Sequence, residues 1–285
     1  MNEQIWRLSV RTAGTSLDAL SGAMYLAGYE GIEILPEAGD GDDHVTVRAY
    51  AVARHGLEEL ARVVAAVPGC LVGRIEEIEV EDWAEGWKKH FQPQEIGATL
   101  VVLPPWVSPK HHPDRMPVVI NPGHAFGTGT HATTRLVLEA LERARPHVPL
   151  RGPVVDLGTG SGILAIAAAK LGLAPVTAID VDPEALYEAQ ENARANAVHL
   201  LVRTVEGDVQ DVPDGARLVL ANLSAPVHRS IAARLAPRLQ PGGRALLSGL
   251  LADETDGIVA AWPAGWEHRV AVLEEWALVE LVAPS

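Results

Sequence analysis

Cysteine is nearly absent from this chain of 285 residues, which contains only Cys70. One cysteine cannot form an internal disulfide, and no Cys/His cluster stands at the spacing of zinc ligands. Cys70 lies in the apolar run VPGCLV without a basic neighbour, a setting typical of a buried packing residue rather than a reactive thiol. We therefore expect no metal requirement, in the fold or in the chemistry.

Long apolar runs are also missing. The most apolar stretch, Ile163 to Ala169, is closed by Lys170 and is much too short to cross a bilayer. The first residues, MNEQIWRLSV, lack the basic segment and apolar run of a secretory signal. Hydrophobic residues make up 48% and charged residues 21% of the chain, as in ordinary globular proteins, and the length accommodates two domains. These features predict a cytoplasmic protein with no membrane association.

Positive charge is scarce. Lys and Arg number 23 against 37 Asp and Glu, so the formal net charge is −14, and the short pair Lys88 and Lys89 is the longest basic run. Autonomous nucleic-acid binding is therefore not expected. A cationic partner fits the charge better, although acidity that serves only solubility would give the same count.

The first eighty residues predict a small domain of strands and helices. Two helical segments are expected, the first capped by Ser16, and four strand-like segments surround them. The order strand, helix, strand, strand, helix, strand is that of a ferredoxin-like α+β domain, with two helices on one face of a sheet. The predicted segments are WRLSVRTA, LDALSGAMYLAGYE, GIEILPE, HVTVRAYAV, GLEELARVVAAV and LVGRIEEIEV.

A linker and a second, larger domain follow. Residues 81–97 contain Trp83, Trp87 and Phe91 at helical spacing, which predicts a linker helix that Pro93 stops. The Pro-rich segment from Leu103 to Pro117 is expected to be an irregular loop with solvated histidines. From there strands alternate with longer helices, which predicts an α/β domain over residues 98–285 with a doubly wound parallel sheet.

The strongest motif is PVVDLGTGSGILAIAAAKLG, in which an apolar strand carries Asp156 and opens into three alternate glycines before a helix. Glycines at Gly158 and Gly160 let the backbone approach a ligand closely. A dinucleotide fingerprint would need a further glycine at Ile163, and no Gly-Lys-Ser/Thr follows for a P-loop. The spacing therefore disfavours both NAD and nucleoside triphosphates as the ligand.

Acidic and amide side chains end the following strands. Asp180 closes VTAIDV, where a carboxylate can accept both hydrogen bonds of a ribose diol, and Asp208 follows the next strand, within reach of an adenine amino group unless it is a surface carboxylate. Asn222 ends LVLANL, where its side-chain oxygen could accept an amine proton and orient the lone pair; the alternative is a turn cap. These positions converge on one edge of the sheet.

Four segments together resemble the bacterial ribosomal protein L11 methyltransferases. They are NPGHAFGTGTHATT (121–134), the glycine motif, IDVDP and ANL, and the tryptophan helix before them matches as well. The resemblance implies a class I methyltransferase domain, Rossmann-like and S-adenosylmethionine-dependent, behind a substrate-recognition domain and a flexible linker. It also implies methylation of lysine side chains and the N-terminal amine of ribosomal protein L11.

The resemblance also implies which residues form the site. Asn222 is the expected catalytic residue, and the segment 126–130 is expected to form a loop over the cofactor. Asn121 and His124 depart from the family pattern, and His131 is expected either to cap a helix or to accept a proton. The predicted cofactor-binding residues are Phe126, Gly127, Thr128, Gly129, Thr130, Thr134, Asp156, Gly158, Thr159, Gly160, Asp180, Asp208 and Asn222.

Two other functions fit the same motifs. The acceptor could be a different protein or a small-molecule amine, because pocket side chains rather than the fold select it. A non-catalytic adaptor that keeps the cofactor fold to hold a partner is the second alternative. For the leading hypothesis we expect a monomer whose acidic N-terminal domain captures the basic ribosomal protein.

Overall fold

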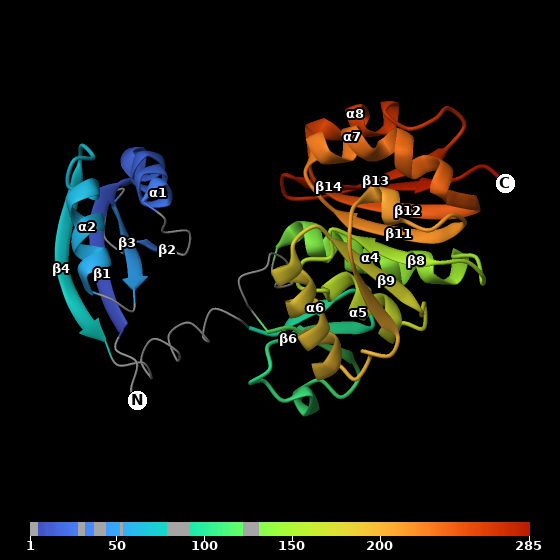
Figure 1. Ribbon diagram of the computed structural model, residues 1–285, viewed down its shortest axis with the longest axis horizontal. Helices are drawn as coiled ribbons and strands as arrows, with labels where there is room; N and C mark the ends of the chain where they lie inside the picture. Colours follow the sequence, from blue (N-terminus) through green and yellow to red (C-terminus); the bar gives the residue numbers. More distant parts are fainter. Residues whose placement is uncertain (1–4, 28–31, 37–43, 52–53, 79–91, 122–130) are drawn as a thin grey trace. The chain divides into compact units, whose positions relative to one another are not determined.

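The computed structural model of the protein describes residues 5–27, 32–36, 44–51, 54–78, 92–121 and 131–285 (Figure 1). The chain divides into two compact units, Met1–His90 and Phe91–Ser285. Most of the predicted linker, residues 81–91, lies outside the described residues. Its last part does not continue a linker, because Gln94–Ile96 form a strand of the second unit.

The N-terminal unit is a four-stranded antiparallel sheet with two helices. Its strands are ordered β2-β3-β1-β4, and β1 pairs antiparallel with both β3 and β4. Leu8 and Val47 of the sheet pack with Leu57 and Leu60 in one buried core, so the helices cover the face that these side chains share. This arrangement confirms the ferredoxin-like prediction. The elements are β1 (Ile5–Ala13), α1 (Leu17–Leu26), β2 (Ile32–Pro36), β3 (His44–Ala51), α2 (Arg54–Val64) and β4 (Cys70–Ile78).

Two local expectations for this unit need adjustment. Ser16, predicted as a helix cap, lies in a 3₁₀ turn, Gly14–Ser16, that leads into α1. Cys70 is half-buried rather than buried, and its thiol lies 3.4 Å from the Thr12 hydroxyl. Cys70 therefore packs at the start of β4 with a polar neighbour.

The C-terminal unit is built on a seven-stranded sheet ordered β10-β9-β8-β11-β12-β14-β13. The first five strands run parallel, and β14 is antiparallel to both of its neighbours. The strand order reverses beside β8, which is where open α/β sheets bind ligands. The strands are β8 (Val154–Leu157), β9 (Val176–Asp180), β10 (Val202–Glu206), β11 (Ala216–Asn222), β12 (Leu239–Leu251), β13 (Glu267–Leu273) and β14 (Trp276–Val282).

Helices cover both faces of this sheet, as the predicted doubly wound architecture requires (Figure 1). Residues of α4 and α5 belong to the core on one face, and residues of α7 and α8 to the core on the other. Every residue of α5 from Ile163 to Ala169 is buried, which explains why this stretch is apolar on all sides. Among the described residues, no helix is both long and apolar enough to cross a membrane. The helices are α4 (Ala132–Ala144), α5 (Ile163–Lys170), α6 (Pro183–Ala195), α7 (Ala225–Leu235) and α8 (Thr255–Ala260).

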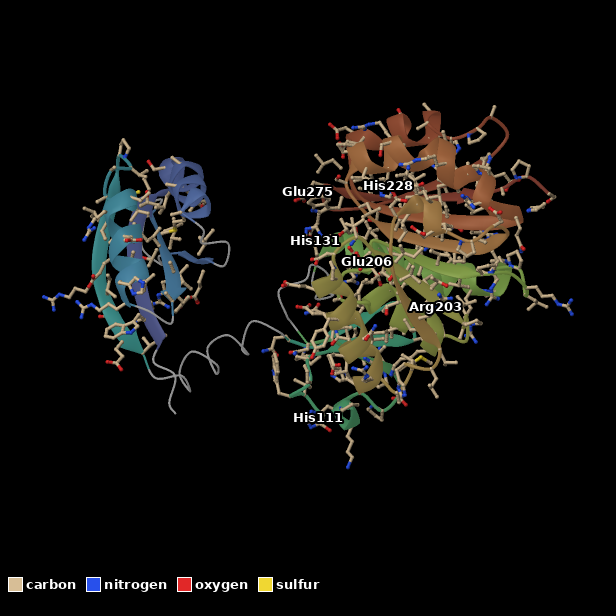
Figure 2. The ribbon with its side chains drawn as sticks, in the orientation of Figure 1. His111, His131, Arg203, Glu206, His228 and Glu275 are labelled. Carbon is tan, nitrogen blue, oxygen red and sulfur yellow. The ribbon has the colours of Figure 1, made fainter. Side chains whose placement is uncertain are left out.

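A small three-stranded sheet precedes this core and was not predicted. It contains β5 (Gln94–Ile96), β6 (Leu100–Leu103) and β7 (Met116–Val119), with β5 antiparallel and β7 parallel to β6. The Pro-rich connection between β6 and β7 is irregular as expected, apart from a 3₁₀ turn that contains the exposed His111 (Figure 2).

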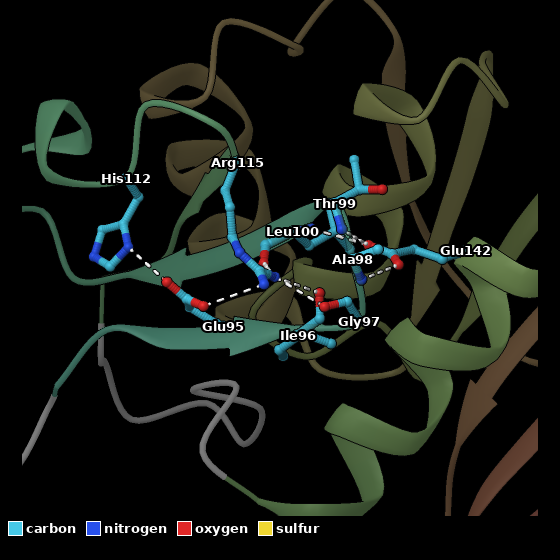
Figure 3. Close-up of polar contacts among 9 residues, drawn as sticks. All are labelled: Glu95, Ile96, Gly97, Ala98, Thr99, Leu100, His112, Arg115 and Glu142. Atoms are coloured by element: carbon cyan, nitrogen blue, oxygen red, sulfur yellow. Dashed lines mark hydrogen bonds and ion pairs between the residues drawn. The ribbon is translucent and has the colours of Figure 1, made fainter.

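Two charged side chains hold the turn between β5 and β6 (Figure 3). The carboxylate of Glu142, on α4, accepts three backbone N–H bonds of 2.9 to 3.0 Å from residues 98–100. The guanidinium of Arg115 donates to the carbonyls of residues 96, 97 and 100, and Glu95 pairs with it at 3.1 Å. His112 contacts the same Glu95 carboxylate at 3.2 Å rather than lying free in solvent. The turn is therefore fixed to α4 through ionic hydrogen bonds.

Replacing Glu142 by glutamine should destabilise the C-terminal unit by about 2 kcal/mol, because the amide nitrogen would face a backbone N–H and leave that donor unpaired. The measurement is urea unfolding of the full chain. Glu139→Gln is the matched control, since among the described residues Glu139 makes an exposed i,i+4 pair with Arg135 on the same helix and no other ion pair. It should change stability by less than about 0.5 kcal/mol. Equal effects of the two variants would contradict this role of Glu142.

Candidate active site

The carboxyl ends of four neighbouring strands meet at one edge of the sheet. Leu157 of β8 pairs with Ile179 of β9 and Ala221 of β11, and Glu206 of β10 pairs with Asp180. The segments after these strands therefore leave the sheet at one level. They are the segments in which the sequence placed its candidate residues.

A cavity of about 520 Å³ lies among these segments. Its volume is within the usual range for a small-molecule or cofactor site. Glycine backbone and acidic side chains line it together with apolar groups from α5 and α7. The lining residues are Thr134, Leu157, Gly158, Thr159, Gly160, Ile163, Leu164, Asp180, Val181, Asp182, Ala185, Gly207, Asp208, Val209, Asn222, Leu223, Val227 and Ile231.

Asp156 lies beneath the glycine loop and does not line this cavity. It is fully buried, and its Oδ2 accepts hydrogen bonds from the Thr159 hydroxyl at 2.6 Å and from the Ala165 backbone at 3.0 Å. The pKa of Asp156 is raised to about 7, mainly by burial; the two hydrogen bonds oppose this rise, and nearby Asp180 adds to it. The expectation of a direct cofactor contact is therefore replaced: Asp156 shapes the loop between β8 and α5.

Asp180 lines the cavity and also braces the glycine loop. Its Oδ2 accepts the Gly160 backbone N–H at 2.9 Å, and its Oδ1 accepts that of Asp182 at 3.1 Å. A carboxylate has about four lone-pair sites, so acceptor capacity is left for a ligand hydroxyl on each oxygen. The geometry is compatible with the predicted ribose contact.

Asp208 lines the cavity from the segment after β10, but its oxygens have local partners. It caps the 3₁₀ turn Val209–Asp211, where Oδ1 accepts the Gln210 backbone N–H at 2.7 Å and Oδ2 lies 3.3 Å from the Gln210 amide. These hydrogen bonds, with Arg234 nearby, lower the pKa of Asp208. Asp208 thus serves at least as a turn cap, and it holds a negative charge at the rim.

Asn222 ends β11 at the cavity and has its amide fixed by two threonines of α4. Its Nδ2 donates to the Thr133 hydroxyl at 3.2 Å and to the Thr134 hydroxyl at 3.3 Å. Its Oδ1 is buried and has no hydrogen-bond partner among the described residues. A buried acceptor without a partner is unfavourable by about 1–3 kcal/mol. Because Asn222 also lines the cavity, a donor from a ligand could satisfy this oxygen.

The orientation of this amide follows from His131, the N-cap of α4. Its Nδ1 accepts the Thr133 backbone N–H at 3.4 Å, so this nitrogen carries no proton and the Thr133 hydroxyl, 2.8 Å away, donates to it. Having used its hydrogen, that hydroxyl can only accept from Asn222, which turns Nδ2 toward it and Oδ1 away. The helix-capping expectation for His131 is confirmed, and its ring also packs against Trp276 with centroids 4.7 Å apart.

Sequence reasoning missed Thr133 and His228. His228 of α7 is 1% exposed (Figure 2). Its Nε2 lies 2.8 Å from the Ser248 carbonyl, which also accepts the Leu223 N–H. Burial lowers the pKa of His228, so the ring is neutral and supports the end of β11. The only sequence signal for Thr133 is its position directly before the predicted Thr134.

Several predicted residues lie outside the described residues. These are Phe126, Gly127, Thr128, Gly129 and Thr130, together with His124. The remaining predicted residues converge on one cavity, with Asp156 directly beneath it. Asn121 is described, at the end of the segment that leaves β7.

The donor and acceptor groups of the cavity fit S-adenosylmethionine. Residues of the glycine loop line the cavity, Asp180 offers oxygens for ribose hydroxyls, and the Asn222 Oδ1 lacks a donor among the described residues. Apolar side chains such as Val209, Leu223 and Ile231 offer a surface for a purine ring.

Comparison with known proteins agrees with this geometry. The family model of ribosomal protein L11 methyltransferase (PrmA) matches residues 5–283. The ribosomal protein L11 methyltransferase of Symbiobacterium thermophilum is 41% identical over 251 residues, 87% of this chain and 78% of the relative. That of Pelotomaculum thermopropionicum is 39% identical over 238 residues, 81% of this chain and 76% of the relative.

A solved structure gives the same result at the level of the fold. The ribosomal protein L11 methylase of Lactobacillus delbrueckii subsp. bulgaricus superposes with a TM-score of 0.61 at 26% identity, over 68% of this chain and 99% of that one. The family match spans both units of the chain. The chain therefore belongs to the ribosomal protein L11 methyltransferase family of S-adenosylmethionine-dependent protein methyltransferases.

Proposed function

We propose that this chain methylates ribosomal protein L11 on lysine side chains and on its N-terminal amine, with Asn222 as the residue that receives the amine. Family membership supports the reaction, the cofactor and the protein substrate. The observation that carries the residue assignment is the buried Oδ1 of Asn222, which faces no donor among the described residues. An amine N–H is a donor of the required kind.

S-adenosylmethionine, when bound, supplies a methyl group on a positively charged sulfonium sulfur. Gly158, Gly160 and Asp180 would hold it, and Asp156 and Thr159 keep the glycine loop in shape from below. A lysine amine has a pKa near 10.4 and must be neutral to act as a nucleophile. The neutral Asn222 oxygen can accept one amine hydrogen and direct the lone pair without stabilising an ammonium ion, as a carboxylate would.

We assign recognition of the protein substrate to the N-terminal domain, residues 1–80. The linker that follows would allow the catalytic domain to reach several amines. The helices cover one face of its sheet, and the opposite face presents Arg7, Arg48 and Tyr50 with Glu33 and Glu76 in ion pairs and hydrogen bonds. A polar sheet face of this kind suits a folded protein partner. Tyr50→Ala should raise KM for intact L11 and leave kcat unchanged, and an unchanged KM would remove this assignment.

The chain is further proposed to act as a monomer in the cytoplasm, without autonomous nucleic-acid binding. The net charge of −14 opposes contact with phosphate backbones. Sedimentation of the full chain tests the first point, and retention on RNA at low salt tests the second.

The central experiment is the intact mass of purified L11 after incubation with the chain and S-adenosylmethionine. Increments of one methyl mass that disappear with Asn222→Ala are expected. No increment with cofactor binding still measurable would favour the alternative acceptors, another protein or a small-molecule amine. No cofactor binding at all would favour the non-catalytic adaptor.

Thr133→Val should lower kcat about tenfold, because the Asn222 amide loses the hydroxyl that His131 orients and keeps only the Thr134 hydroxyl, which can accept or donate and so does not fix the amide orientation. Thr133→Ser keeps the hydroxyl and should restore most of the rate. S-adenosylhomocysteine affinity should stay within about twofold in both variants, since Thr133 does not line the cavity. Equal rates of the valine and serine variants would contradict the orientation that His131 and Thr133 impose.

A further inference from the structure

Asn192 of α6 and Asn196, the residue that caps the C-terminus of this helix, are buried against two separate segments of the C-terminal unit. Asn192 is 3% exposed and Asn196 is 7% exposed. A buried amide in a helix is unfavourable unless its groups are hydrogen-bonded, and all four side-chain polar groups of this pair have partners. The pair therefore has a specific function in the fold.

The two side-chain amides bond the backbone groups on the outer edge of β7, as a neighbouring strand would. Asn196 Oδ1 accepts the Val119 N–H at 2.9 Å, and its Nδ2 donates to the Val119 carbonyl. Asn192 Oδ1 accepts the N–H of Asn121, two residues on, at 3.0 Å. The inner edge pairs with β6, where Ile120 donates to Leu103. The alternation of inner and outer groups is that of a strand with two neighbours.

Asn192 differs from Asn196 in what its second group contacts. Its Nδ2 donates to the Ser161 carbonyl at 2.9 Å, and Ser161 belongs to the glycine loop whose first residues line the cavity. The next residue, Gly162, has φ +81°, and a Cβ there would stand 2.9 Å from Ala189 on the same helix α6. The glycine loop and α6 are thus in close contact, so the loop cannot shift along the helix without breaking the Asn192 hydrogen bond.

We propose that Asn192 is a positioning residue that holds the segment after β7 in register with the cofactor loop. The proposal rests on the function proposed above. One amide fixes the Asn121 N–H on one side and the Ser161 carbonyl on the other. His131 and Thr133, which orient Asn222, stand further along the chain from Asn121. Asn192 therefore ties the backbone at Asn121 to the glycine loop, whose first residues line the cavity.

Asn192→Ala should raise the Kd for S-adenosylhomocysteine and lower kcat on L11, each about tenfold, because both tethered groups lose a buried partner. The matched control is Asn196→Ala. It removes a similarly buried amide at the end of the same helix, which bonds β7 but makes no hydrogen bond to the glycine loop among the described residues. Its Kd and kcat should stay within about twofold of the wild type. If both variants change Kd and kcat in proportion to their loss of thermal stability, Asn192 is only structural and the proposal fails.

A second variant and a wild-type measurement cover the case in which the alanine variant does not fold. Asn192→Asp keeps an acceptor for Asn121 and loses the donor for Ser161. In the wild type, S-adenosylhomocysteine should slow hydrogen exchange of the peptide that contains Asn121, and Asn192→Asp should abolish that slowing. No slowing in the wild type overturns the proposal. A wild type that does not bind S-adenosylhomocysteine removes the proposed function as well, which separates the two failures.

Discussion

Replacing Asn222 by alanine should lower kcat on ribosomal protein L11 about a hundredfold, since the amine loses the acceptor that directs its lone pair. The loss should appear in kcat more than in the Kd for S-adenosylhomocysteine, because Asn222 is only one of many residues that line the cavity. Single-turnover mass spectrometry of L11 gives the rate, and calorimetry gives the Kd.

Asn222→Asp provides the sharper comparison, because it keeps the size and changes the charge. One carboxylate oxygen would face the Thr133 and Thr134 hydroxyls in place of the amide nitrogen. The Thr133 hydroxyl could donate a hydrogen bond to this carboxylate oxygen only if it gave up its hydrogen bond to His131. A carboxylate would also stabilise the ammonium form of the acceptor, which cannot attack. We expect a loss at least as large as that of the alanine variant; wild-type activity in either would exclude Asn222 from the transfer.

The parts of the site that were predictable are those that a parallel sheet forces together. An apolar strand followed by glycines, and acidic or amide residues that end the next strands, must meet at one edge whatever the loops do. Gly158, Asp180 and Asn222 were found in this way, and the structure places them around one cavity. The ferredoxin-like unit was equally predictable, because its strands and helices have clear periods of two and 3.6.

The rest depended on contacts between residues distant in the sequence. The strands β5, β6 and β7 are three or four residues long, too short for a periodic signal. Glu142 and the turn that it holds are more than forty residues apart, and so are Asn192 and Asn121. The glycine motif predicts a ligand contact for Asp156, but the strand directs this side chain under α5, where it bonds Thr159 and Ala165. Which face a strand-end residue takes is set by the sheet, not by the motif.

Asp156 should make the C-terminal unit less stable as the pH rises from about 4 to about 7. Its pKa is raised from 3.8 to about 7 in the folded chain, mainly by burial. Between these values the folded state binds more protons than the unfolded state, so the free energy of unfolding falls with pH. A tenfold change in proton affinity corresponds to about 1.4 kcal/mol, which puts the full effect on the order of 4 kcal/mol. Above about pH 7 the effect is complete and stability no longer depends on this group.

Asp156→Asn isolates this contribution from all other titrating groups. Its amide oxygen can accept the Thr159 and Ala165 hydrogen bonds that Oδ2 now accepts, so the variant imitates the protonated acid. Urea unfolding of both proteins should give similar stabilities near pH 4 and a more stable variant near pH 8, by a few kcal/mol. A difference that does not change with pH would show that Asp156 titrates normally. The acceptor amine works in the opposite direction, because its neutral fraction grows with pH. The fraction of reactive, neutral acceptor amine therefore rises over the same pH range in which the C-terminal unit becomes less stable.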